Sequence, residues 1–76
     1  MNTAKLRNDI KKKLDRWNER SLFTLKGTKW LTKSDMDTLL VCCDWYDRHG
    51  SLEGIALSPG VKQVLKSYGA ALPGKF

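Results

Sequence analysis

Residues 33–49 constrain the fold more than any other part of the chain, because they predict one apolar helix with a defined start and end. Thr32 and Asp35 have the spacing of a capping box, in which each side chain satisfies a backbone N–H of the other residue. Gly50 then stops the helix. One apolar face holds Met36, Leu39, Leu40, Cys43 and Tyr46, and it is widened by Val41, Cys42 and Trp45. A helix that is apolar over most of its girth has to be covered, so we expect it at the centre of the molecule.

Two shorter amphipathic segments can cover this central helix. The first runs from about Ala4 to Glu19, with Asn2 or Thr3 as its cap, and the second begins at Ser58-Pro59 and ends at Gly69. Each has an apolar stripe at helical spacing: Leu6, Ile10, Leu14 and Trp17 in the first, and Val61, Val64, Leu65 and Tyr68 in the second.

The segment between the first two helices has two interpretations. Phe23-Thr24-Leu25 and Lys29-Trp30-Leu31 flank Lys26-Gly27-Thr28, which can form a small hairpin that turns at Gly27. An irregular loop pinned by its two aromatic residues explains the same sequence equally well. A hairpin of this size needs a helix beneath it to persist.

The length of the chain, 76 residues, allows one small domain with a thin core. We therefore predict a mostly α-helical, compact three-helix domain over residues 1–69, with a short β-hairpin or an extended loop between helices 1 and 2. Residues 70–76 contain proline and glycine, and we expect them to form a flexible C-terminal tail.

The residue inventory leaves little for catalysis or for metal binding. Cys42 and Cys43 are adjacent, and His49 is the only histidine, so zinc lacks both the ligands and their usual spacing. We expect two reduced, buried thiols, no cofactor and no enzymatic activity, since no nucleophile is spaced against a base and no glycine-rich loop precedes a helix. The longest apolar run, residues 39–43, is too short to cross a membrane, and we expect a cytoplasmic protein.

Charge gives the strongest functional signal, because it alternates in three blocks. Residues 1–33 hold ten Lys and Arg against three acids, residues 34–54 hold five acids against one Arg, and residues 55–76 add three lysines, for a net charge of +6. Such a field steers a protein toward a charged partner and orients it there. We predict that the first block binds the partner through Lys5, Arg7, Lys11, Lys12, Lys13, Arg16, Arg20, Lys26, Lys29, Trp30 and Lys33.

Two classes of partner fit this surface. A pI near 9.6 suits nucleic acid, and Trp17, Phe23 and Trp30 could stack on exposed bases or lie in the core. A helix-turn-helix reader is not favoured, because the stretch from Gly50 to Ser58 exceeds a turn of three or four residues. A membrane-surface role is not favoured either, since the first apolar stripe is needed to cover the central helix.

The acidic block instead favours a protein partner, because a surface made only for phosphates gains nothing from clustered carboxylates. Trp30 and Trp45 are then candidate interface anchors, with burial in the core as the alternative for both. The clustered carboxylates are those of Asp37, Asp44, Asp47 and Glu53.

The overall design is short, basic, helical and poor in cysteine, and it resembles small bacteriophage-encoded regulators that bind host RNA polymerase. The resemblance is one of class and covers the whole chain. It implies a non-enzymatic transcription regulator that occupies a surface of RNA polymerase or of an associated factor. We expect a monomer, and the alternative function is direct, largely non-specific binding of DNA or RNA.

Overall fold

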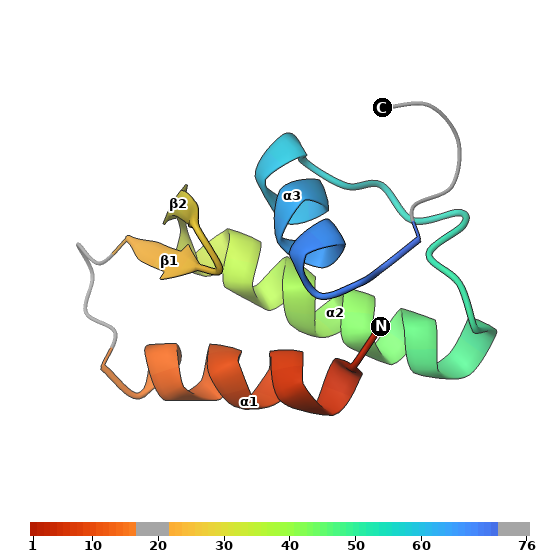
Figure 1. Ribbon diagram of the computed structural model, residues 1–76, viewed down its shortest axis with the longest axis horizontal. Helices are drawn as coiled ribbons and strands as arrows, with labels where there is room; N and C mark the ends of the chain where they lie inside the picture. Colours follow the sequence, from red (N-terminus) through yellow and green to blue (C-terminus); the bar gives the residue numbers. More distant parts are fainter. Residues whose placement is uncertain (17–21, 72–76) are drawn as a thin grey trace.

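The computed structural model describes residues 1–16 and 22–71. The elements follow in the order α1 (Thr3–Leu14), β1 (Phe23–Leu25), β2 (Thr28–Leu31), α2 (Lys33–His49) and α3 (Pro59–Ser67). In Figure 1, α2 runs through the middle of the molecule, with α1 along one side and the hairpin and α3 on the other. The predicted mostly helical fold is confirmed, and of the two interpretations of the segment before α2 the hairpin is the correct one.

Local signals start and stop the helices as expected. The Thr32–Asp35 capping box is complete: the Asp35 N–H donates to Thr32 Oγ1 at 3.2 Å, and the Thr32 N–H donates to Asp35 Oδ2 at 3.0 Å. Gly50 ends α2 in the left-handed conformation at φ 73°. Ser58 caps α3 by accepting the N–H of Val61 at 3.3 Å, with proline in the first turn.

The first helix is shorter than predicted. Its start is correct, since the Asn2 side chain accepts the N–H of Lys5 at 3.0 Å. Its end is not at Glu19, because Asp15 and Arg16 already form a tight turn in which the Arg16 N–H donates to the Lys13 carbonyl. Trp17 and Arg20, two residues to which the sequence assigned roles, lie outside the described residues.

The core lies between α2 and the elements around it. All of its members are less than a tenth exposed, namely Leu6, Ile10, Phe23, Leu25, Leu31, Met36, Leu39, Cys42, Cys43, Leu52, Val61, Val64, Leu65, Tyr68 and Ala70. Periodicity thus selected buried residues in both flanking helices: Leu6 and Ile10 of the first stripe and all four of the second are buried, and Leu14 packs partly buried against the core. Val41 does not widen the apolar face as expected: its side chain is 54% exposed, because α1, α3 and the hairpin cover only part of the girth of α2.

Two other residues near the edge of the core, Trp45 and Ala70, form hydrogen bonds within the fold. Trp45 packs partly buried against the core, and its Nε1–H donates to the Glu53 carbonyl at 3.0 Å. Ala70, where the tail was expected to begin, is buried, and its N–H donates to the Leu65 carbonyl at 3.0 Å. Residues 72–76 of the expected tail lie outside the described residues.

Candidate binding surface

Where α1 lies against α2, one cation is held between two carboxylates. Arg7 Nη2 lies 2.7 Å from Asp44 Oδ1 and 2.7 Å from Asp47 Oδ2, and the Thr3 hydroxyl donates to Asp47 Oδ1 at 2.9 Å. The hydrogen bond from Arg7, followed by that from Thr3, lowers the pKa of Asp47. We call Thr3, Arg7, Asp44 and Asp47 the α1–α2 seam. Arg7, predicted to bind a partner, is thus already engaged in joining two helices.

Other predicted binding cations also have intramolecular partners. Lys33 Nζ lies 3.0 Å from Asp37 Oδ2, and Lys5 Nζ lies 3.6 Å from Asp9 Oδ2. Together with the seam and the capping box, these contacts give most carboxylates of the acidic block a partner within the same chain, although the carboxylates stay at the surface. The fold itself therefore accounts for the acidic block, and the block no longer argues for a mixed-charge protein partner.

Lys26, in the hairpin turn, contacts Tyr68 at the end of α3, and Tyr68 in turn contacts α1. Lys26 and Gly27 have φ values of 45° and 86°, and positive φ at both central residues is typical of a type I′ turn. Lys26 Nζ lies 4.7 Å from the centre of the Tyr68 ring, and the Tyr68 hydroxyl donates to Asp9 Oδ2 at 2.5 Å. That hydrogen bond is the main cause of the lowered pKa of Asp9, and burial raises the pKa of Tyr68. Lys26 is therefore a positioning residue.

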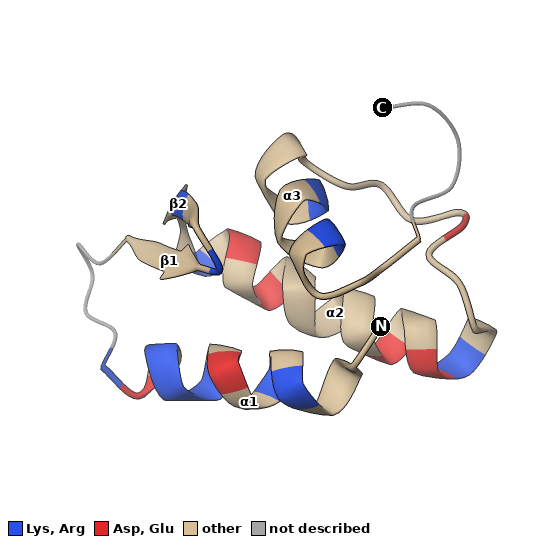
Figure 2. Cartoon of the chain, viewed as in Figure 1, with Lys and Arg blue, Asp and Glu red and all other residues tan. Residues whose placement is uncertain are grey.

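The remaining predicted cations form no ion pair with any residue in 1–16 or 22–71. They are Lys11, Lys12, Lys13, Arg16 and Lys29, and all of them are exposed. We call this set the basic end, because four of its members occupy the last turn of α1 and the turn after it, and the fifth lies on β2. Figure 2 shows blue at this end of α1, and also on the first half of α1, at the hairpin, on α3 and at the far end of α2.

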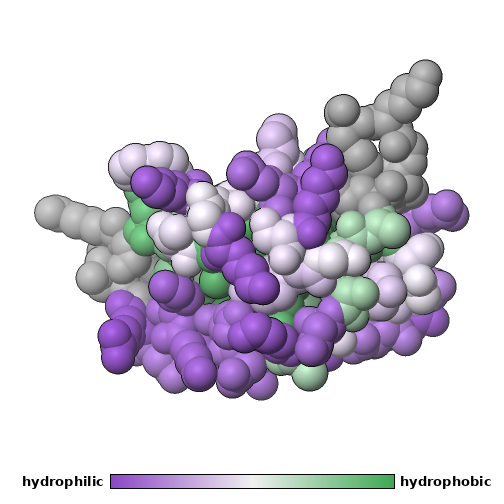
Figure 3. Space-filling model, viewed as in Figure 1, coloured by the Kyte–Doolittle hydropathy of each residue, from purple (hydrophilic) through white to green (hydrophobic). Residues whose placement is uncertain are grey.

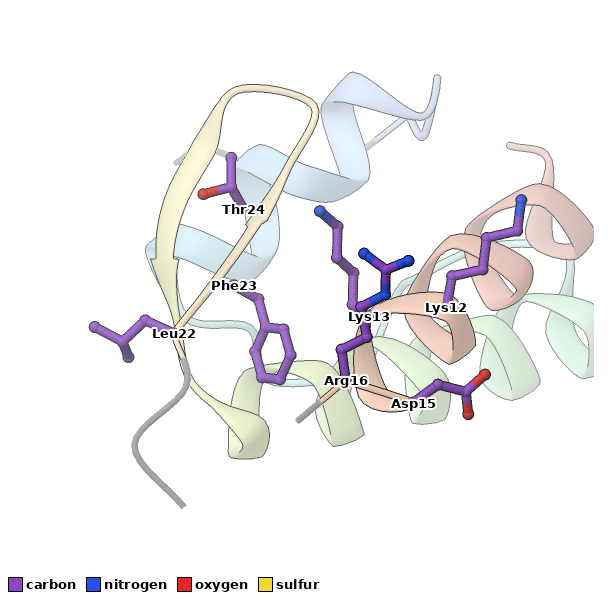
Figure 4. Close-up of a pocket in the computed structure, with 7 residues that line it drawn as sticks. All are labelled: Lys12, Lys13, Asp15, Arg16, Leu22, Phe23 and Thr24. Carbon is purple, nitrogen blue, oxygen red and sulfur yellow. The ribbon is translucent and has the colours of Figure 1, made fainter. Parts of the chain in front are cut away.

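An open hollow of about 670 Å³ lies between the end of α1 and β1. Lys12, Lys13, Asp15 and Arg16 line its helix side, and Leu22, Phe23 and Thr24 line its strand side. In Figure 4, Lys13 and Arg16 rise from the helix end on the side of the hairpin, whereas the Asp15 carboxylate points the other way. The space-filling view shows hydrophilic surface along α1, with apolar surface between α1 and the hairpin (Figure 3). Among the described residues, the helix side of the hollow is therefore mainly cationic and the strand side largely apolar.

A second, smaller hollow adjoins the first along β1. Its volume is about 110 Å³, and it shares Leu22, Phe23 and Thr24 with the larger hollow while adding Lys29 and Trp30. The Trp30 side chain is 75% exposed. This exposure rules out burial in the core, whereas the role of interface anchor stays a prediction. One strand thus separates the α1 cations from an exposed indole with a lysine next to it.

A β-bulge explains why Trp30 faces outward. Phe23 pairs with Leu31, and Leu25 pairs with Thr28, so one residue of β1 lies opposite two residues of β2, Lys29 and Trp30. Strict alternation would turn Trp30 inward; the extra residue instead leaves both exposed between buried neighbours. Trp30 has φ 66°, a left-handed conformation that costs a residue with a Cβ about 1–2 kcal/mol. The inward residues of β2, Thr28 and Leu31, are therefore three positions apart rather than two.

The two cysteines and the histidine lie away from these hollows and contact other parts of the fold. Burial raises the pKa values of Cys42 and Cys43 to about 11, so at neutral pH both thiols carry their protons and are weak nucleophiles. His49 stacks on Trp45, with 4.4 Å between ring centres. Within the described ranges no group of three His, Cys, Asp or Glu could hold a metal ion, and no helix is long and apolar enough to cross a membrane.

The basic end and Trp30 together form the candidate binding surface, wrapped around β1. Of the other predicted site residues, Arg7, Lys5, Lys26 and Lys33 have partners within the fold, and Arg20 lies outside the described residues. Comparison of the chain with protein-family models, with curated proteins and with solved structures finds no match.

Proposed function

We propose that this protein is a small non-enzymatic regulator that binds the transcription machinery, with RNA polymerase or an associated factor as its partner, and that it acts as a cytoplasmic monomer. The contact is made by the basic end together with Trp30. The observation that carries the proposal is the contrast in ion pairing: the cations of the basic end have no carboxylate partner among the described residues, whereas Arg7, Lys5 and Lys33 do.

Unpaired, clustered cations favour a partner with a strong negative field. Surface charges that lack an internal partner contribute to association with an anionic partner and to its orientation. The nucleic-acid channels of a polymerase present both acidic protein and phosphate to a basic ligand, which is why the resemblance to phage regulators of RNA polymerase suits this surface. Binding should weaken as salt rises, because exposed charge pairs are screened over about 8–10 Å at physiological ionic strength.

A second candidate function is direct, largely non-specific binding of DNA or RNA. The exposure of Trp30 beside Lys29 favours it, since proteins that hold single strands combine cations with aromatic stacking surfaces. The ion pairs of the acidic block favour nucleic-acid binding further. Carboxylates that are paired with cations of the same chain repel phosphate less.

The test compares two double variants with the same loss of charge. Lys12→Gln with Lys13→Gln removes two cations of the basic end, and Arg48→Gln with Lys66→Gln removes two exposed cations elsewhere. All four residues lie in the last turn of a helix, so any loss of favourable interaction with the helix dipole is comparable. Binding to immobilised RNA polymerase is measured for both variants.

We expect the Lys12/Lys13 variant to bind about 2- to 30-fold more weakly, since each exposed charge pair contributes about 0.2–1 kcal/mol. The Arg48/Lys66 variant should bind like the parent protein. Equal effects of the two variants would contradict the proposal. Retention of the polymerase at a salt concentration that dissociates naked DNA supports the first function, and the reverse order supports the second.

A further inference from the structure

Trp30 occupies a position that the fold alone would fill with another residue. The bulge requires a left-handed backbone at this point, which glycine or asparagine adopts with little strain. The indole is 75% exposed, so it adds little to the core in return. A strained backbone that displays a large aromatic side chain to solvent is an outlier of the kind found at binding sites.

The surroundings of Trp30 narrow the chemistry of what it can bind. Lys29 precedes it on the same strand, and Leu22 and Thr24 complete the smaller hollow. Across β1 lie the cations Lys13 and Arg16 in the adjoining hollow. The surface thus combines a flat apolar ring with one lysine on the same strand and further cations on the other side of β1. Its complement is a ligand in which flat rings alternate with anionic groups.

We infer that the smaller hollow is a site for single-stranded nucleic acid, in which an unpaired base stacks on Trp30 while the phosphates on either side contact Lys29 and the α1 cations. The inference rests on the proposed role of the basic end as a surface for anionic partners, and it names the ligand chemistry there. Unpaired strands are favoured over duplex, because a base within a duplex is already stacked on both faces. Every base has a π-face, so we expect little sequence preference.

The experiment measures the fluorescence anisotropy of a short labelled oligothymidylate titrated with the full chain. Trp30→Ala removes the stacking surface, and Trp30→Phe retains an aromatic face. Val41→Ala is the matched control, because Val41 is another exposed apolar residue, on α2 and outside both hollows. Trp30→Asn is included because asparagine tolerates the left-handed backbone, so this variant keeps the fold if alanine does not. Circular dichroism verifies folding.

We expect Trp30→Ala and Trp30→Asn to bind oligothymidylate about 5- to 150-fold more weakly, which corresponds to the loss of one stacked base. Trp30→Phe should retain most of the affinity, and Val41→Ala all of it. Polyglutamate, which carries charge without bases, should bind equally to the parent and to the Trp30 variants.

Three outcomes overturn the inference: unchanged oligothymidylate affinity in folded Trp30→Asn, an equal effect of this change on polyglutamate, or binding of duplex DNA with the same dependence on Trp30. An equal effect on polyglutamate would point to an acidic protein segment as the ligand. The same variants assayed on RNA polymerase separate the two proposals. Loss of polymerase binding in the Lys12/Lys13 variant without any Trp30 effect on oligothymidylate leaves the proposed function standing and removes the stacking site.

Discussion

The α1–α2 seam and the basic end are both rich in cations, and they use them in opposite ways. In the seam, Arg7 lies 2.7 Å from each of two carboxylates and holds one helix against another. At the basic end, Lys12 and Lys13 further along the same helix and Arg16 in the turn after it have no ion pair with a described residue. Net charge alone does not distinguish these uses, whereas the position of the carboxylates does.

The backbone shows the same contrast. Around α2 each local rule is obeyed: a complete capping box at the start and a left-handed glycine at the end. In the hairpin two residues with side chains, Lys26 and Trp30, adopt positive φ, and both are exposed. Proteins tend to depart from local preferences at functional sites, so the departure at Trp30 directs attention to the hairpin.

The largest effect on stability should come from the core beneath the seam. Leu6 is fully buried, so Leu6→Ala should lower the free energy of unfolding by about 2–5 kcal/mol through lost burial and a residual cavity. Trp30→Ala should change it by less than about 0.5 kcal/mol, as is usual for surface residues. Urea denaturation measures both. Comparable losses in the two variants would show that the hairpin indole is structural.

A gain in stability is expected within the hairpin itself. Thr28 is buried, and its Oγ1 has no hydrogen-bond partner in the part of the chain that the structure describes. Thr28→Val keeps the shape and removes the unsatisfied hydroxyl, so it should raise the free energy of unfolding by about 1 kcal/mol. Thermal denaturation of Thr28→Val beside Thr24→Val, an exposed position on the facing strand, isolates the effect. A loss of stability in Thr28→Val would refute it.

Relief of backbone strain should give a smaller gain. Trp30→Asn places a residue that tolerates positive φ at the bulge, and we expect about 0.5–1 kcal/mol of added stability. The measurement is again urea denaturation, with Thr24→Asn as the control on the neighbouring strand. A destabilised Trp30→Asn would mean that the indole contributes more to packing than its exposure suggests.

The weakest expected effect is the dependence of the seam on pH. The pKa of Asp47 is lowered from 3.8 by Arg7 and Thr3, and that of Asp9 is lowered chiefly by Tyr68. A carboxylate with a depressed folded-state pKa contributes stability above its unfolded value, and this is lost as pH falls through the folded value. Stability should therefore decline below about pH 5, less steeply in Asp47→Asn. The free energy of unfolding is measured from pH 7 downward, with Asp15→Asn as the control. If Asp47→Asn loses stability with falling pH as steeply as the parent protein, the seam is not the source of the pH dependence.

Short-range physics made much of the fold predictable. The capping box, the glycine after α2 and the Ser58-Pro59 start depend on neighbours a few residues apart, and each is confirmed. The partners of Arg7 could not be predicted in the same way. They are 37 and 40 positions away in the chain, and the register of α1 against α2 is not contained in either periodicity.

The sequence indicated which part of the chain is rich in cations, but not which of those cations are left without an intramolecular partner. Lysine content directed the prediction to the first block, but within that block Lys5 and Lys33 form ion pairs and Lys26 lies over Tyr68. Trp30 had two interpretations, because a bulge shifts alternation by one residue and only the paired strand reveals it. The exposure of Val41 likewise depends on how much of α2 the other elements cover.

The most direct test is a map of amide and indole chemical shifts in the ¹⁵N-labelled protein during titration with oligothymidylate. The account predicts that the Trp30 indole N–H and the backbone amides of residues 11–16 and 22–31 shift together, while the Trp45 indole and the α1–α2 seam stay in place. Shifts centred on α3, on the far end of α2 or on the seam would contradict it.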